Sequence, residues 1–225
     1  MKSFEELQEG VYDPNIFKAF FLAGGPGSGK SYVVKRTTGG LGMRVVNSDD
    51  AFEKLVKAAG MTMKMDTKKG REQEADRDKL RDVAKRVTKL RQQNYIEGRL
   101  GLIIDGTARD YDKLESEMRA LQQLGYENYM IFVNTSLDVA LQRNEERPRT
   151  LPEKIVVQSW KNVQSNIGRF SNLFKENFII VDNNDPNEPP HLEVFKRVQK
   201  LAKKKVTNGI AKAWIANELE MKRRS

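Results

Sequence analysis

The stretch GGPGSGKS at residues 24–31 fits the phosphate-binding pattern G-x-x-x-x-G-K-[ST]. Residues 16–23 (IFKAFFLA) form an apolar, aromatic run that predicts a buried strand, and residues 31–36 can begin a helix. In such a strand–loop–helix unit, backbone N–H groups and the helix N-terminus surround a phosphate. The pattern predicts that Lys30 reaches the β- and γ-phosphates and that the Ser31 hydroxyl binds Mg²⁺. The whole loop is expected to bind the nucleotide: Gly24, Gly25, Pro26, Gly27, Ser28, Gly29, Lys30 and Ser31.

Short apolar runs recur along the chain between longer helical patterns. After the run at 16–23 we expect strands at residues 44–47, 101–104, 129–133 and 178–181. This alternation of strands and helices predicts a three-layer α/β fold of the P-loop kinase type, with five parallel strands in the order 2-3-1-4-5. Right-handed crossovers would bring the loops that follow the strands to one edge of the sheet, where ligands bind.

The segments between the strands have helical patterns. We expect helices at residues 71–99, 112–124, 152–174, 192–206 and 210–221. Residues 185–190 are the clearest linker. We therefore predict a kinase domain at residues 1–185 and a basic helical hairpin at residues 191–225, appended to it.

Carboxylates follow two of the predicted strands. Asp105 ends the strand that runs into IIDGTARD and is expected to hold Mg²⁺, directly or through water, although an Asp there can also cap the next helix. Asp49 and Asp50 follow the second strand, where one can accept the proton of an attacking hydroxyl and the other can cap a helix. Arg109 is either a substrate contact or a solvated side chain.

Arginines cluster in the segment QRNEERPRTLPEK. Arg143, Arg147 and Arg149 suit the spread charge of a transferring phosphoryl group, and Pro148 and Pro152 bracket a short non-helical span. We expect a lid at about residues 143–152 that closes over ATP and excludes water; a plain charged surface loop is the alternative.

Two further segments have a weaker connection to a ligand. Asn183 or Asn184, in the loop after the fifth predicted strand, is expected near the nucleotide base. Met61, Met63 and Met65 alternate in a polar stretch and either line an acceptor site or pack as a small satellite core.

Composition excludes several classes of function. The chain of 225 residues has no cysteine, and its single histidine, His191, lies in a Pro-rich turn, so disulfides, thiolate chemistry and His-based metal sites are not expected. It has no apolar run long enough to span a membrane and no secretory signal, which predicts a cytoplasmic protein. The net charge is +9, of which +8 lies in residues 196–225, so this tail is either a nucleic-acid contact or a solvated surface.

The motifs GGPGSGKS, NSDDAF, LIIDGTARD and QRNEERPRTLPEK together resemble the zeta-toxin and polynucleotide-kinase branch of P-loop kinases, with zeta-toxin-like members closest. The resemblance runs from about residue 17 to residue 184 and implies phosphoryl transfer from ATP to an alcohol. Zeta-toxin-like members phosphorylate a hydroxyl of a UDP-activated amino sugar, whereas polynucleotide kinases phosphorylate 5′-hydroxyl ends.

By position, the resemblance makes Lys30 and Ser31 the phosphate and metal residues. Asp49 is the general base when counted without gaps from the strand, and Asp50 is the base when the family pattern D-x-F is matched. The resemblance also implies a substrate contact for Thr107 and lid roles for Arg143 and Arg149, whereas Arg147 has no clear counterpart. Asp105, which is also a candidate substrate contact, stands where zeta toxins usually have Glu and polynucleotide kinases have Asp. Polynucleotide kinases carry an arginine where this chain has Phe52, and residues 60–70 match neither group.

The sequence thus predicts a kinase that uses Mg²⁺ and ATP to phosphorylate a small nucleotide or nucleotide sugar. A polynucleotide 5′-hydroxyl kinase that holds its strand with the basic tail is one alternative. A non-catalytic ATP-binding module whose tail docks a partner protein is the other. The identity of the acceptor is not encoded in any of these motifs.

Overall fold

The structure of the chain is a computed structural model, and it describes residues 10–63, 67–106, 108–146, 150–185 and 191–224. Its centre is a five-stranded parallel sheet in the order β2-β3-β1-β4-β5, as predicted. The strands are β1 (Lys18–Ala23), β2 (Arg44–Val46), β3 (Leu102–Asp105), β4 (Glu127–Asn134) and β5 (Phe178–Asp182). Every residue of β1 is buried because the strand lies in the middle of the sheet and is covered on both faces.

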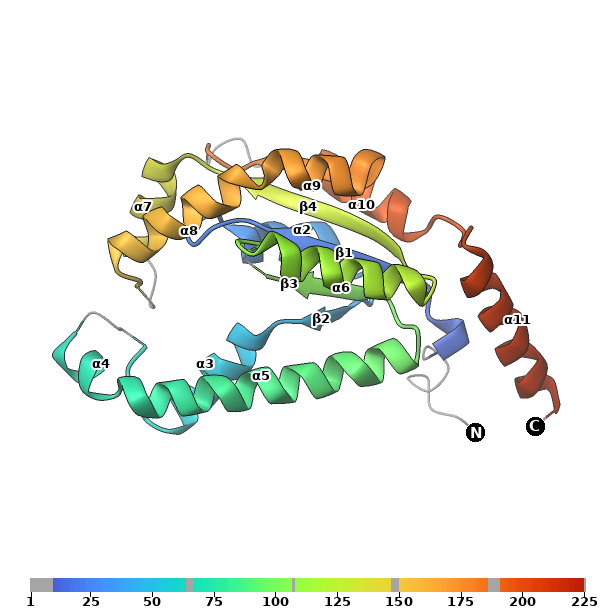
Figure 1. Cartoon of the computed structure of the whole chain (residues 1–225), viewed down its shortest axis with the longest axis horizontal. Helices are drawn as coiled ribbons and strands as arrows, with labels where there is room; N and C mark the ends of the chain where they lie inside the picture. Colours follow the sequence, from blue (N-terminus) through green and yellow to red (C-terminus); the bar gives the residue numbers. More distant parts are fainter. Residues whose placement is uncertain (1–9, 64–66, 107, 147–149, 186–190, 225) are drawn as a thin grey trace.

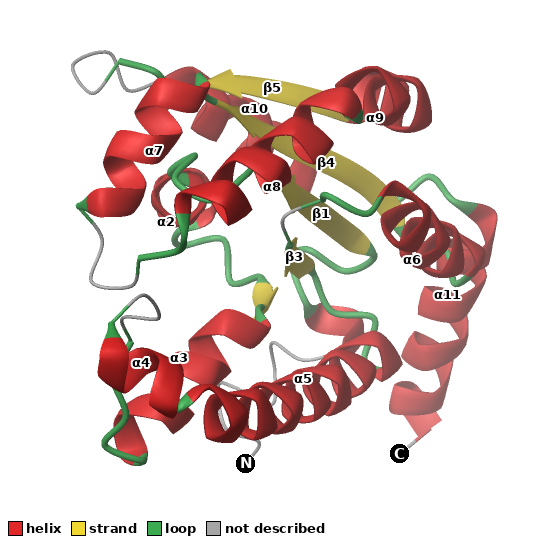
Figure 2. Cartoon of the chain, turned by 60° about the vertical axis from the view of Figure 1, so that its left-hand side comes forward, coloured by secondary structure: helices red, strands yellow, loops and turns green. Residues whose placement is uncertain are grey.

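Helices cover both faces of this sheet (Figures 1 and 2). Those of the first half of the chain are α2 (Lys30–Thr38), α3 (Ser48–Ala58), α4 (Lys68–Glu72) and α5 (Glu74–Glu97). The second half has α6 (Tyr111–Gln123), α7 (Leu137–Glu145), α8 (Glu153–Ser165), α9 (Ile167–Phe174), α10 (His191–Ala202) and α11 (Gly209–Arg224). Two short 3₁₀ turns, η1 (Gly10–Tyr12) and η2 (Lys175–Asn177), precede β1 and β5.

The alternation of side chains along β1 divides the core into two clusters. Phe20 and Leu22 face the layer formed by α2 and α10. Phe17, Ala19 and Phe21 face the layer that contains α6, α8, α9 and α11. A third, smaller cluster joins α3 to α5 and lies beside the edge strand β2. The sheet is therefore closed on both faces, and the edge at which its strands end is left for the loops that carry the polar motifs.

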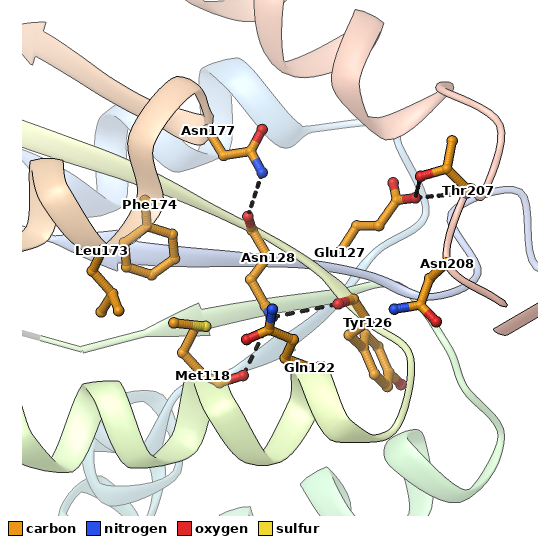
Figure 3. A pocket seen from close by; sticks show the side chains of 10 residues that line it. All are labelled: Met118, Gln122, Tyr126, Glu127, Asn128, Leu173, Phe174, Asn177, Thr207 and Asn208. Atoms are coloured by element: carbon orange, nitrogen blue, oxygen red, sulfur yellow. Dashed lines mark hydrogen bonds between the residues drawn. The ribbon is translucent and has the colours of Figure 1, made fainter. Parts of the chain in front are cut away.

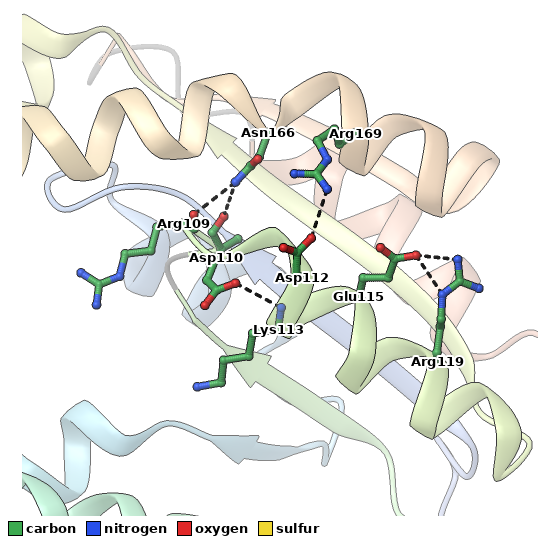
Figure 4. Close-up of polar contacts among 9 residues, drawn as sticks. Arg109, Asp110, Asp112, Lys113, Glu115, Arg119, Asn166 and Arg169 are labelled. Carbon is green, nitrogen blue, oxygen red and sulfur yellow. Dashed lines mark hydrogen bonds and ion pairs between the residues drawn. The ribbon is translucent and has the colours of Figure 1, made fainter.

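Two long predicted helices are each divided in the structure. The pattern at 152–174 forms α8 and α9, which meet at Asn166. The buried Asn166 side chain donates hydrogen bonds to the carbonyls of Ala108 (3.4 Å) and Arg109 (3.3 Å), which tie the junction of the two helices to the loop after β3 (Figure 4). The pattern at 71–99 likewise includes the end of α4, and α5 begins after Gln73, whose side chain accepts a hydrogen bond from the Thr62 backbone.

The two C-terminal helices pack against different faces of the sheet. Val194 and Val198 of α10 belong to the cluster shared with α2, whereas Ala211 and Trp214 of α11 pack against the cluster on the other face. The connection between them is tied to the start of β4, where the Glu127 carboxylate accepts hydrogen bonds from Thr207 at 2.7 and 2.8 Å. Both helices contribute to the core of the sheet, while a domain boundary near residue 185 stays a prediction.

This packing predicts that α11 stabilises the fold. The Trp214 ring lies edge-on to Phe17, with 5.5 Å between centroids, and covers the start of β1. We expect Trp214→Ala to lower the free energy of unfolding by about 3 kcal/mol, because it removes a large ring from a packed site. Met221→Ala, on the same helix but 57% exposed, is the control and should change it by less than about 0.5 kcal/mol. Urea denaturation of the whole chain measures both; equal, small losses would show that α11 is peripheral.

Candidate active site

The glycine loop follows β1 and leads directly into α2, as the pattern predicted. Gly27 and Gly29 both have φ of +78°, a backbone conformation that other residues rarely adopt. A Cβ on Gly27 would lie 2.1 Å from the Ala140 carbonyl oxygen of α7, and one on Gly29 would lie 2.3 Å from the Asn183 side-chain nitrogen. The loop is thus a tightly supported backbone turn ahead of a helix N-terminus, and this arrangement fits a bound phosphate chain.

Lys30 and Asp105 meet beside this loop. The Lys30 Nζ atom lies 2.8 Å from Asp105 Oδ1, and the two side chains are 16% and 7% exposed. The other carboxylate oxygen of Asp105 accepts a hydrogen bond from Asn47 Nδ2 at 2.8 Å. Because β1, β2 and β3 end at the same edge, three residues distant in sequence form one polar network.

The structure separates the two adjacent aspartates, which the sequence left as alternatives. Asn47 caps α3 by accepting the Asp49 N–H at 2.7 Å, which makes Asp49 and Asp50 the second and third residues of the helix. The Asp49 carboxylate lies 3.5 Å from the Nη1 atom of Arg81, on α5. Asp50 instead lies 3.5 Å from Asn47 Nδ2, on the side of Asp105.

The surroundings of Asp50 disfavour its ionised form. Although Asp50 is an exposed residue, partial desolvation of its carboxyl is the largest cause that raises its pKa above the ordinary value; repulsion from Asp105, Glu53 and Asp49 adds to it, against an opposing effect of Lys54. The folded protein therefore binds this proton more tightly than the unfolded chain does. As pH rises through the ordinary and then the raised pKa, stability is lost, so that at neutral pH the ionised Asp50 destabilises the fold.

The destabilising effect of the ionised Asp50 gives a prediction that can be tested without a substrate. Asp50→Asn should raise the thermal unfolding midpoint at pH 7, because it removes a carboxylate that the fold disfavours. The gain, about 1–3 °C, should shrink as the pH falls through the raised pKa and should be lost below the ordinary pKa of 3.8, where the carboxyl is protonated in both the folded and the unfolded wild type. Thermal melts of both proteins across this range measure it. A gain that is the same at every pH would attribute the effect to something other than this charge.

Arg143 and Asn183 support the loop from the opposite side. Arg143, in the last turn of α7, donates from Nη1 to the Asn183 backbone carbonyl at 2.7 Å. The side-chain amide of Asn183 donates to the Ser28 carbonyl at 2.8 Å. Asn184 turns away, and its Oδ1 atom accepts the Ser136 N–H at 2.7 Å. Contact of either asparagine with a nucleotide base stays a prediction.

Other predicted site residues lie apart from this network or outside the described residues. Thr107, Arg147 and Arg149 lie outside them, and so does Met65. Arg109 is exposed, and its side chain extends away from the Asp112–Arg169 ion pair (Figure 4). The predicted lid begins inside α7, and its two ends are joined where Asn144 and Leu151 exchange hydrogen bonds of 2.9 and 3.1 Å.

Two residues of this region carried no role in the sequence-based prediction. The side-chain amide of Asn47 contacts the carboxylates of both Asp50 and Asp105, although an asparagine at this position is typical of an ordinary helix cap. Arg81 pairs with Asp49 and lies over the Phe52 ring, with 4.1 Å from Cζ to the ring centroid. Its contacts join α3 to α5, which are distant in sequence. Met61 and Met63 pack in the cluster that joins these helices, which is the satellite-core alternative.

The residues present fit a nucleotide with Mg²⁺. Helix α2 begins at Lys30, after a turn in which Gly27 and Gly29 leave no room for a side chain. The helix N-terminus and the Lys30 ammonium group both favour an anion. Ser31 is exposed at the start of α2, and Asp105 follows β3, which gives Mg²⁺ a hydroxyl and a carboxylate. Within the described ranges, no group of three or more His, Cys, Asp or Glu side chains is arranged to hold a metal ion.

A separate pocket of about 320 Å³ lies at the opposite edge of the sheet, where β4 begins (Figure 3). Tyr126, Glu127 and Asn128 of this region line it, together with residues of α6, α9 and the α10–α11 connection. Because Lys18 and Glu127 pair at the start of the parallel strands, this pocket lies a full strand away from the loop that follows Ala23. It contains none of the predicted site residues.

Comparisons with known proteins agree with this architecture. The family described as AAA domain (AAA_33) matches residues 20–169. No curated protein matches the chain. Among solved structures, a candidate kinase from Chloroflexus aurantiacus superposes with a TM-score of 0.54 at 13% identity, covering 82% of this chain and 94% of that one.

The AvrRxo1-ORF1:AvrRxo1-ORF2 complex is also similar, in two structures. The one with sulphate ions gives a TM-score of 0.56 at 16% identity, covering 85% of this chain and 66% of that one. The native complex gives 0.53 at 16% identity, covering 80% and 63%. At these identities the likeness shows a shared fold. It does not single out the zeta-toxin branch.

Proposed function

The chain belongs to the family of AAA domains described as AAA_33, and on this premise we propose that it is a kinase that transfers the γ-phosphoryl group of ATP to a hydroxyl group of a small acceptor. The observation that carries the proposal is the polar network at one edge of the sheet. A phosphate loop, its lysine, a buried aspartate and a second carboxylate with a raised pKa converge there from three strands. A protein that only binds nucleotide has no need of the second carboxylate.

In the proposed reaction, the loop at residues 24–31 holds the triphosphate with its backbone N–H groups. Asp50 accepts the proton of the acceptor hydroxyl, whose oxygen forms a bond to the γ-phosphorus. The bond between that phosphorus and the β–γ bridging oxygen breaks, and ADP leaves. Lys30 and Arg143 neutralise the charge on the phosphoryl oxygens; Arg149 is proposed to join them. Mg²⁺, held by Ser31 and Asp105, would neutralise the developing charge on the phosphates.

Asp50 is proposed as the base in place of Asp49 because of their different neighbours. The Asp49 carboxylate is held in an ion pair with Arg81. Asp50 has three carboxylates nearby, those of Asp105, Glu53 and Asp49, and a raised pKa, which suits it to accept a proton. Thr107 and Arg109 are proposed substrate contacts on the strength of their position after β3.

The acceptor class is proposed from the resemblance to zeta-toxin-like kinases: a nucleotide or nucleotide sugar. The arrangement of the tail supports a small acceptor over a nucleic-acid end. Lys203, Lys204 and Lys205 follow α10, and the connection to α11 lies beside the start of β4, at the edge opposite the loop (Figure 1). A nucleic-acid strand held there would not be directed at the triphosphate.

Among the described helices, none combines the length and apolar character that a membrane crossing requires.

The proposal is tested with ATP radiolabelled at the γ-phosphate and a panel of nucleosides, sugar nucleotides and 5′-hydroxyl oligonucleotides. We expect Mg²⁺-dependent label on a small-molecule hydroxyl. Label on the oligonucleotides alone would replace the proposal with the end-kinase alternative. ATP binding without transfer to any acceptor would favour the non-catalytic module.

A further inference from the structure

Asn183 is buried directly behind the phosphate loop, in a position that the reaction itself does not use. It is 6% exposed, and its backbone N–H donates to the Asn134 carbonyl at 3.0 Å, which extends the pairing of β4 with β5 by one residue. Its place is therefore fixed by the sheet. From there its side chain crosses to the loop, 155 residues away in sequence, and donates to the Ser28 carbonyl.

The direction of that hydrogen bond bears on the nucleotide. The Ser28–Gly29 peptide is planar and trans, so its carbonyl and its N–H point in opposite directions. When Asn183 Nδ2 holds the Ser28 oxygen at 2.8 Å on the side of β5, the Gly29 N–H is directed to the other side. The same amide nitrogen would lie 2.3 Å from a Cβ on Gly29, so it occupies the space that the glycine leaves.

Asn183 also holds the arginine helix. Its backbone carbonyl accepts the hydrogen bond of Arg143 Nη1 at 2.7 Å, and this guanidinium nitrogen lies 3.6 Å from the position of a Cβ on Gly29. The side chain of Asn183 thus binds the loop, and its backbone carbonyl binds Arg143. In the proposed function, the loop and Arg143 both face the same phosphate chain. If either bond were absent, loop and arginine would be free to move independently.

We propose that Asn183 is a positioning residue that holds the phosphate loop in its anion-binding shape and aligns Arg143 with it. The inference rests on the proposed function, because it concerns the same phosphate site. It differs from the sequence-based expectation that Asn183 contacts the base: the structure gives its amide to the loop backbone, and the role assigned here is independent of which base the nucleotide carries.

A base contact and a loop-positioning role predict different effects on a ligand that has no base. Isothermal titration calorimetry with Mg²⁺ compares the binding of ATP with that of inorganic tripolyphosphate, which has no base or sugar. Asn183→Ala, and Asn183→Leu to retain the volume, should weaken both ligands by the same factor of about ten, the loss expected for one buried hydrogen bond and an unsatisfied carbonyl. Asn172→Ala, which removes the same groups from an exposed asparagine of α9, is the control and should change both by less than about twofold.

Each outcome has a distinct meaning. Weaker ATP binding with unchanged tripolyphosphate binding would assign Asn183 to the base and overturn the positioning role. Unchanged binding of both ligands would also overturn it. Thermal unfolding of each variant tests for a general loss of fold. A large drop in the unfolding midpoint of both Asn183→Ala and Asn183→Leu would overturn a role that is specific to the loop. A wild-type chain that binds neither ligand would instead contradict the proposed function itself.

Discussion

Lys30→Met is expected to weaken ATP binding by about a hundredfold and to reduce phosphoryl transfer further. Methionine keeps the apolar stem of the lysine but removes the ammonium group that the loop places against the phosphates. A hydrogen bond between charged groups accounts for the loss of affinity, and the charge that develops during transfer adds to the loss of rate. Calorimetric titration with ATP measures the first effect, and label transfer from radiolabelled ATP measures the second.

The control for Lys30→Met is Lys35→Met, an exposed lysine on the same helix, which should leave both measurements unchanged. Loss of Lys30 also leaves the buried Asp105 carboxylate without its cation, so the variant should unfold more readily in the absence of nucleotide. Affinity equal to that of the wild type would show that the triphosphate is not bound by this loop.

Asp50→Asn is expected to lower the turnover number by about 10³-fold while ATP affinity changes by no more than about threefold. The amide keeps the size of the carboxyl but cannot accept the proton of the attacking hydroxyl, and general bases contribute about 10²–10⁴ to the rate. The experiment uses the acceptor that the labelling panel identifies, with initial rates at saturating ATP. The same variant is expected to be more stable than the wild type at neutral pH, so that low activity would not reflect a damaged fold.

Asp49→Asn provides the matched control, since the two aspartates are adjacent on α3 and differ in what they face. It breaks the ion pair with Arg81, in which the Asp49 side chain is 53% exposed and the Arg81 side chain 30%, and should change the turnover number by less than about fivefold. A large loss in Asp49→Asn together with normal turnover in Asp50→Asn would exchange the roles of the two residues. Normal turnover in both would remove the general-base step from the mechanism.

The sheet was predictable from the sequence because each strand is short, apolar and followed by a polar signal. The order of the strands was confirmed, and so was the position of the glycine loop between β1 and α2. The burial of both faces explains this success: a central parallel strand is buried throughout, and β1 is apolar at every position after Lys18. The match of the family to residues 20–169 covers the sheet from β1 to β4 and ends before β5.

What the sequence left open depends on contacts between distant segments. The proposal that Asp50 and not Asp49 faces the site depends on the ion pair of Asp49 with Arg81, which is on another helix and has no motif of its own. The interruption at Asn166 follows from its hydrogen bonds to the loop after β3, although the apolar stripe continues through it. The helical periodicity of the tail was visible, whereas the different faces to which α10 and α11 bind were not.

The most direct measurement is a crystal structure of the chain with Mg²⁺ and a non-hydrolysable ATP analogue. The proposed mechanism predicts the β- and γ-phosphates within hydrogen-bond distance of the loop N–H groups and of Lys30 Nζ, with the Asp50 carboxylate turned toward the γ-phosphate and Asp49 turned away. A triphosphate bound elsewhere, or bound in the loop with Asp50 directed to solvent and no carboxylate near the γ-phosphate, would contradict it.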